Sequence, residues 1–127
     1  MFANVTDAER SNGVAYTMEM DAPDSLEAFR EHLRSHFARF PRFTSKLVEP
    51  QAGKFHLEQV IDEQILANFV RIHGESLDFE AMQELTAKEI NDGIDREQTR
   101  LRISIVPKKT DPSKIYIVAY VDHGITD

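Results

Sequence analysis

The sequence contains no cysteine and no tryptophan, and it has only five glycines and five prolines among its 127 residues. Without cysteine the chain cannot form disulfide bonds, thiolate nucleophiles or sulfur-based zinc sites, so catalysis would have to use oxygen or nitrogen bases. It also lacks an apolar run near the ~20 residues that cross a bilayer, and residues 1–4 lack the charged and apolar parts of a signal peptide. We therefore expect a cytoplasmic protein.

Concentrated positive charge is also missing. The formal net charge is −7, and the 15 lysines and arginines are scattered among 22 acidic residues. Because binding to phosphates needs a concentrated basic face, we do not expect a nucleic-acid partner. The length fits one domain, and 41% hydrophobic residues, including eight phenylalanines, are enough for a core. We therefore expect a single globular domain over residues 1–127.

Hydrophobic periodicity predicts the secondary structure. Alternation predicts strands, and apolar residues at three- and four-residue steps predict two amphipathic helices. The first helix follows Asp24, which with Glu27 resembles a capping box, and it runs to about Phe40. The second begins at Ser76 or Asp78 and runs to about Asn91. Strands are expected over 14–21, 43–48, 54–60, 98–107 and 114–121, whereas 61–72 admits either a helix or a short strand over 68–73.

The helices each have an expected inner and outer side. The inward row of the first is Leu26, Phe29, Leu33, Phe37 and Phe40. That of the second is Phe79, Met82, Leu85 and Ile90, with Glu80, Glu84 and Glu89 in water.

The order of elements indicates the fold class. It is strand, helix, hairpin, strand, helix, strand, strand, without repeats or linkers. This order favours an α+β fold in which two amphipathic helices cover a largely antiparallel or mixed sheet. Because residues 114–121 are apolar on both sides, we expect them to form a central strand.

Two histidines invite a metal interpretation. His32 and His36 lie one turn apart on the first predicted helix. No carboxylate or third histidine has an obvious matching place, and ligand sets normally number three or more. We therefore predict no metal site, and we interpret these histidines as solvated.

A histidine and a carboxylate, His123 and Asp127, follow the predicted central strand. An imidazole can accept a proton near neutral pH, and a nearby carboxylate can hold it or its loop in a working orientation. A short spacing of this kind also recurs by chance, so the interpretation depends on its context.

That context comes from three segments. Residues 122–127 (DHGITD) resemble the HHxxxDG motif of the chloramphenicol-acetyltransferase-like superfamily, without its final glycine and with Asp122 in place of the first histidine. Residues 40–48 resemble the "PRF" segment, and residues 94–96 the "LDR" segment, of the wax ester synthase/diacylglycerol acyltransferase family. Along the chain the three segments occur in the family's order. The Pro and Trp that are common after the "LDR" segment in the lipid-making enzymes are absent here.

The resemblance implies a function. Such enzymes have two similar lobes around a tunnel, and this chain corresponds to the N-terminal lobe, ending within the motif. His123 would act as the general base that deprotonates an acceptor alcohol, which then attacks an acyl thioester. The co-substrate would be acyl-CoA or an acyl group on the pantetheine arm of a carrier protein. Asp127 would be structural and pair with an arginine, for which Arg42 is our candidate.

Two interpretations remain open at this stage. One is an O-acyltransferase lobe, inactive by itself because its C-terminal lobe is missing. The other is a catalytically inactive domain that serves as a binding or scaffold module, since fold does not guarantee activity. A lobe without its partner would expose apolar surface and a sheet edge, so we expect self-association. Peripheral association with lipid is compatible with either interpretation.

Overall fold

The computed structural model describes residues 13–95 and 97–122. His123 and Asp127 lie outside these residues. The strands are β1 (Gly13–Asp21), β2 (Ser45–Gln51), β3 (Lys54–Gln59), β4 (Val70–Ile72), β5 (Leu101–Pro107) and β6 (Lys114–Asp122). The helices are α2 (Leu26–Ala38), α3 (Glu63–Asn68) and α4 (Phe79–Asp92). None of these helices is both long enough and apolar enough to span a bilayer.

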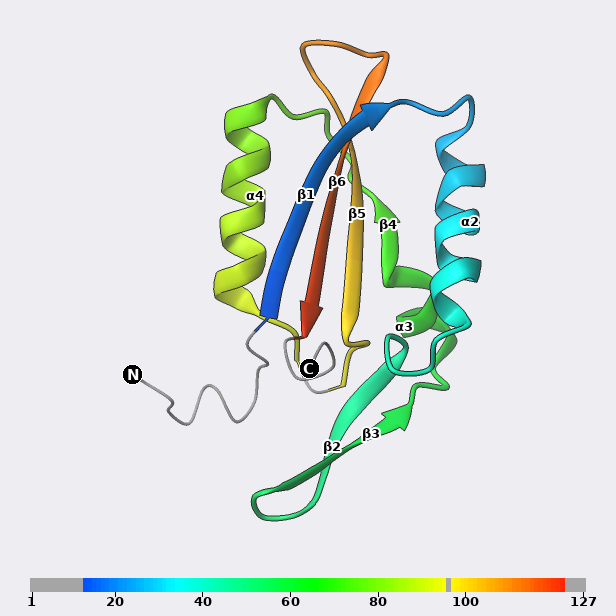
Figure 1. The fold of residues 1–127 in the computed structure, drawn as a ribbon, viewed down its shortest axis with the longest axis vertical. Helices are drawn as coiled ribbons and strands as arrows, with labels where there is room; N and C mark the ends of the chain where they lie inside the picture. The colour runs from blue at the N-terminus through cyan, green and yellow to red at the C-terminus, as the bar shows by residue number, and fades with distance from the viewer. Residues whose placement is uncertain (1–12, 96, 123–127) are drawn as a thin grey trace.

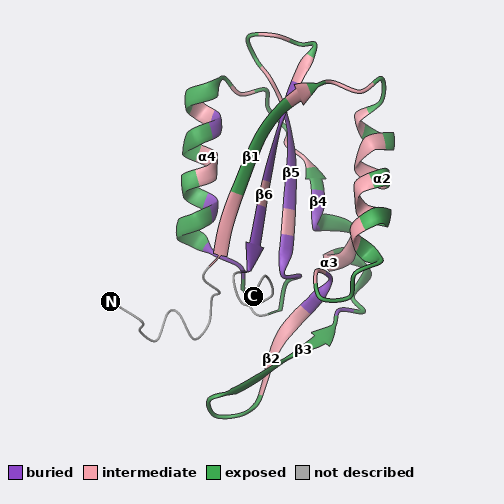
Figure 2. Cartoon of the chain, viewed as in Figure 1, coloured by how far each residue is buried: buried purple, intermediate pink, exposed green. Residues whose placement is uncertain are grey.

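Four of the strands form one mixed sheet in the order β1-β6-β5-β4, and β2 and β3 form a separate hairpin (Figure 1). β6 is antiparallel to both β1 and β5, whereas β4 is parallel to β5. The α+β prediction with a largely antiparallel or mixed sheet is therefore confirmed. The prediction that residues 114–121 form a central strand is confirmed as well, since β6 pairs on both sides and is almost entirely buried (Figure 2).

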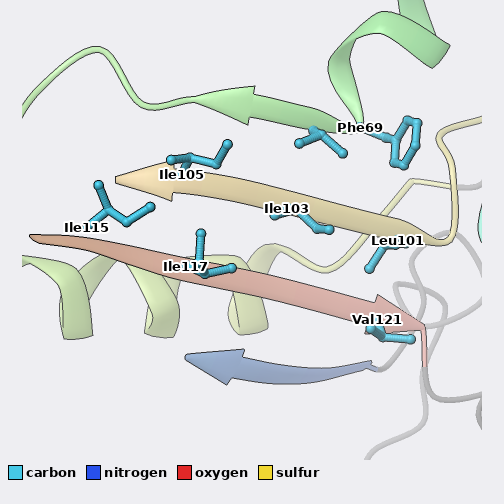
Figure 3. Close-up of a cluster of buried hydrophobic side chains, with 8 residues drawn as sticks. Phe69, Leu101, Ile103, Ile105, Ile115, Ile117 and Val121 are labelled. Carbon is cyan, nitrogen blue, oxygen red and sulfur yellow. The ribbon is translucent and has the colours of Figure 1, made fainter. Parts of the chain in front are cut away.

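The two long helices cover opposite faces of this sheet. Alternate residues of β5 and β6 on one face form the larger core cluster, with Phe69 and Val70 beside them (Figure 3). The predicted inward residues of α2, from Leu26 to Phe37, pack against it. On the other face α4 contributes Met82 to a smaller cluster with Val106, Tyr116 and Val118. Because side chains of a strand alternate in direction, β5 and β6 supply both clusters.

The ends of α2 correct two details. Ser25, not Asp24, is the N-cap, because its backbone is extended and its hydroxyl oxygen accepts from the backbone N–H of Ala28. At the other end the helix stops at Ala38, so Phe40 leaves the predicted inward row and is exposed. Its ring instead packs edge-on against Phe43.

The segment over 61–72 contains both structures that the sequence admitted. α3 is capped by Asp62, whose carboxylate accepts from the backbone N–H of Gln64. After Phe69 the chain extends into β4, which joins the sheet edge beside β5. The predicted hairpin is confirmed: β2 and β3 are joined by a turn in which Gly53 has a φ of +78°.

The outer and inner sides of α4 differ from the prediction. Asp78 caps the helix as expected, but Phe79 and Ile90 are 58% and 47% exposed, and Glu89 is only 7% exposed. Glu89 is buried because it meets two arginines from the sheet, Arg71 on β4 and Arg102 on β5. A carboxylate at this position pairs with both guanidinium groups, and its loss would leave them without that partner.

Candidate functional site

The turn that resembles the "PRF" segment lies against the start of β5. Its chain is folded by backbone hydrogen bonds from Phe43 to Phe40 and from Thr44 to Pro41. The carbonyls of Phe43 and Ser45 then accept from the backbone N–H groups of Leu101 and Arg100, at 3.2 and 3.1 Å. The turn is thereby joined to the sheet near the end of β6.

The segment that resembles "LDR" reaches the same place from α4. Ile94 is fully buried, and the carbonyl of Asp95 accepts a hydrogen bond from Nη2 of Arg100. The carbonyl of Gln98 accepts a second bond from the same nitrogen at 3.0 Å. The third residue of this segment, position 96, lies outside the described residues.

Arg100 completes the arrangement by binding the last residue of β6. Its Nη1 donates to the carboxylate of Asp122 at 3.0 Å, and its backbone carbonyl accepts from the Asp122 N–H at 2.9 Å. Arg100 is completely inaccessible to solvent, and Asp122 is 7% exposed. The three segments singled out in the sequence therefore meet at Arg100: the "PRF" segment contacts its main chain, and Asp95 and Asp122 contact its guanidinium.

The electrostatics of this pair follow from its burial. Burial lowers the pKa of the Arg100 guanidinium, and the hydrogen bond and charge of Asp122 act in the opposite direction. A buried side chain keeps its charge when it is paired with an opposite charge and hydrogen-bonded. Arg100 is paired with Asp122 and hydrogen-bonded to the carbonyls of Asp95 and Gln98. Its Nε is buried without a hydrogen-bond partner among the described residues.

The predicted site residues are only partly described. Arg42 is exposed in the turn before β2. His123 and Asp127 lie outside the described residues, so the general base and the Arg42–Asp127 ion pair stay predictions.

Sequence reasoning missed the role of Arg100. It placed this residue on the polar side of a strand over 98–107, but β5 begins only at Leu101 and Arg100 is buried. The available signal was an arginine near the start of the strand expected over 98–107 and an aspartate directly after the strand expected over 114–121, Arg100 and Asp122.

A second polar region lies at the C-terminal half of α4. Glu89 accepts from Nη2 of Arg102 at 2.6 Å and from Nη2 of Arg71 at 3.2 Å. These residues, with Lys88, Asp92, Gly93, Asp95 and Gln98, line a polar cavity of about 620 Å³. Its three cationic and three anionic side chains balance, so its charge favours no particular class of ligand.

The described residues contain no group of three or more histidine, aspartate or glutamate side chains that could hold a metal ion. His32 and His36 line a small cavity of about 230 Å³ with Ser35 and Arg39. The ring of His36 packs edge-on against Phe37 and Phe40.

Comparison with known proteins gives a fold and no family. No family model matches this chain, and no curated protein matches it. Among solved structures, one from work on condensation domain-mediated chain release from the enacyloxin polyketide synthase is similar over 88% of this chain, with 16% identity and a TM-score of 0.57. The tallysomycin biosynthesis protein TlmII is similar over 87%, with 9% identity and a TM-score of 0.64.

A third similar structure is the SgcC5 protein from Streptomyces globisporus, which matches 90% of this chain with 15% identity and a TM-score of 0.59. The matched regions are only 22%, 26% and 26% of the three longer chains, respectively. At these identities the likeness concerns the fold alone. The chain thus has an α+β fold that it shares, over most of its length, with one part of each of these longer proteins.

Proposed function

We propose that residues 1–127 form the N-terminal lobe of an acyltransferase that moves an acyl group from a thioester to an alcohol. The observation that carries the proposal is that Ser45, Asp95 and Asp122 all hydrogen-bond to Arg100. Each of them belongs to one of the three segments whose sequences resemble acyltransferase motifs, and Asp122 directly precedes His123 in the sequence. The lobe fold shared with a condensation domain supports the same class of reaction.

The reaction needs one base and one leaving group. The imidazole of His123 removes the proton of the acceptor hydroxyl while the hydroxyl oxygen attacks the thioester carbonyl. A tetrahedral oxyanion forms, the carbon–sulfur bond breaks, and the thiolate takes the proton back from the imidazolium. The products are an ester and a free thiol, coenzyme A or the pantetheine arm of a carrier protein. No redox partner is required.

The remaining roles concern support of the base. Asp127 would hold the loop by pairing with Arg42, which would require the carboxylate and guanidinium to approach within ~4 Å. Neither residue takes part in proton transfer in this proposal.

A second lobe would complete the site. The chain matches only about a quarter of the similar structures, and its edge strand β1 exposes Tyr16 and Met18, at 57% and 58%. We propose that a C-terminal lobe covers apolar surface of this kind and contributes the rest of the substrate tunnel. Self-association of the isolated lobe, and association with lipid, would use the same apolar side chains.

The decisive experiment replaces the proposed base in the complete reading frame that contains residues 1–127. The assay follows release of free thiol from acyl-CoA in the presence of primary alcohols of different length. His123→Ala should slow turnover about 10²–10⁴-fold, the range that general base catalysis contributes. His56→Ala, an exposed histidine on the β2–β3 hairpin, is the matched control and should leave turnover unchanged.

The outcomes separate the two functions considered. Equal turnover of the parent and His123→Ala would overturn the role of His123. Saturable binding of acyl-CoA without any thiol release would favour a binding or scaffold domain. One observation favours that alternative: the residue at the first motif position is an aspartate, Asp122, and its carboxylate forms a buried ion pair with Arg100. Thiol release with primary amines but not with alcohols would support acyl transfer and overturn the alcohol as the acceptor.

A further inference from the structure

We propose that Arg100 is a positioning residue of the candidate site. Its hydrogen bonds hold Asp122 at the end of β6 in a fixed position relative to Ser45, Asp95 and Gln98. Arg100 thereby sets where the segment that carries His123 begins. The meaning of this role rests on the proposed function, but the contacts that carry it belong to the described residues.

The first step is the double attachment of Asp122. Its backbone N–H donates to the Arg100 carbonyl, and its carboxylate accepts from the Arg100 guanidinium. A residue held through both its main chain and its side chain has little freedom to shift or rotate. His123 is bonded directly to it, so a displacement at position 122 is passed to the next residue. Misplacement by about 1 Å can slow an enzyme about 10²-fold.

The second step is the fork geometry of the guanidinium. Nη1 donates a hydrogen bond to the carboxylate of Asp122, while Nη2 donates to the carbonyls of Asp95 and Gln98. One rigid, planar group therefore spans β6 and the segment before β5. A lysine has one nitrogen on a flexible stem, so it would keep the positive charge without holding both sides at a fixed separation.

The third step is a comparison with the neighbouring Arg102. Arg102 is also largely buried and also paired with a carboxylate, but its partner is Glu89 on α4. Arg102 lies opposite Tyr120 on β6, whereas Arg100 bonds to the last residue of that strand. The two arginines share residue type, charge and kind of partner. Arg100 hydrogen-bonds to Asp122, the last residue of β6, whereas the guanidinium of Arg102 lies over the ring of Tyr120, two residues earlier. Arg102 is therefore a matched control for loss of a buried guanidinium.

The experiment uses the isotopically labelled 127-residue chain and follows the imidazole cross-peaks of its histidines by NMR. The His123 peak is assigned as the one lost in His123→Gln. In Arg100→Lys we expect this peak to move by several line widths or to split into more than one. In Arg102→Lys we expect it to stay within one line width of the parent. Each spectrum is recorded well below the melting temperature of that variant.

The comparison of the two lysine variants distinguishes positioning of His123 from a general contribution to stability. An unmoved His123 peak in Arg100→Lys would overturn the proposal, and so would an equal movement in Arg102→Lys. If Arg100→Lys does not fold, Asp122→Asn takes its place, since it is isosteric and only weakens the bond to Nη1. An unmoved peak in that variant would be equally contradictory. The spectra require no turnover, so failure of the acyl-transfer assay and failure of the positioning proposal are distinguishable.

Discussion

Arg100 and Arg102 stand two residues apart at the start of β5, and they hold different parts of the molecule. Arg100 joins the sheet to itself, because its carboxylate partner Asp122 ends the neighbouring strand. Arg102 joins the sheet to a helix, because its partner Glu89 lies on α4. In the first pair the arginine is inaccessible to solvent, whereas the second pair borders a cavity open to solvent and shares Glu89 with the half-exposed Arg71.

The bonding partner and the degree of burial, not the residue type, therefore determine which parts of the fold a buried arginine holds together. A guanidinium whose hydrogen bonds are all to main-chain carbonyls and a strand-end carboxylate fixes backbone segments relative to one another. A guanidinium paired with a helical glutamate fixes the position of a helix. We expect loss of the first to affect stability more, since fewer water molecules can replace the lost partner.

The largest effect is expected for Asp122→Ala. This change leaves the Arg100 guanidinium buried with only carbonyl partners, and removing one partner of a buried pair typically destabilises a protein by about 3–5 kcal/mol. Urea denaturation followed by circular dichroism measures the loss in the free energy of unfolding. A loss below about 1 kcal/mol would mean that the pair resembles an exposed ion pair, and the contrast with Arg102 would then disappear.

A smaller effect is expected for Glu89→Ala. It removes the partner of Arg102 and of Arg71, but Arg71 is half exposed and regains hydration. We therefore expect a loss of about 1–3 kcal/mol in the free energy of unfolding. The same urea titration measures it.

Glu84→Ala is the matched control for that change. It makes the same substitution on the same helix at an exposed position, so its effect should stay within about 0.5 kcal/mol of zero. Equal losses for Glu84→Ala and Glu89→Ala would show that helix propensity, and not the contact with the sheet, explains the result.

The sequence was informative wherever local pattern and burial agree. The apolar steps of α2 and the doubly apolar β6 predicted their elements, because each packs the face or faces that its pattern marks. The alternation in β1 also predicted a strand, but Tyr16 and Met18 of its apolar row are exposed at the sheet edge. The turn between β2 and β3, residues 52–53, was readable from Gly53, whereas Pro50 lies within β2.

The sequence was less informative where the burial of a residue depends on a partner far along the chain. Glu89 and Arg100 are both charged, and a charged residue in a regular pattern is usually on the wet side. Their burial depends on contacts between segments 13 to 22 residues apart, which single-residue patterns do not encode. The "PRF" and "LDR" resemblances did mark segments that both contact Arg100. The pairing expected for Arg42 stays a prediction, because Asp127 lies outside the described residues.

The smallest effect is expected in the turn between β5 and β6, which provides an exposed reference for both buried pairs. There Asp111 accepts hydrogen bonds from the hydroxyl and backbone N–H of Ser113, which hold the pKa of its carboxyl below the usual value. Such a carboxylate contributes stability above its unfolded pKa of about 3.9, and this contribution is lost as the pH falls through the lower native value. Asp111→Asn should therefore lower the melting temperature slightly at pH 7, less than either buried variant does, and the difference from the parent should close in strong acid. Thermal melts across this range measure it, with Asp24→Asn as the control for the change in net charge. A difference that persists unchanged in acid would assign the effect to turn geometry and not to the ionised carboxylate.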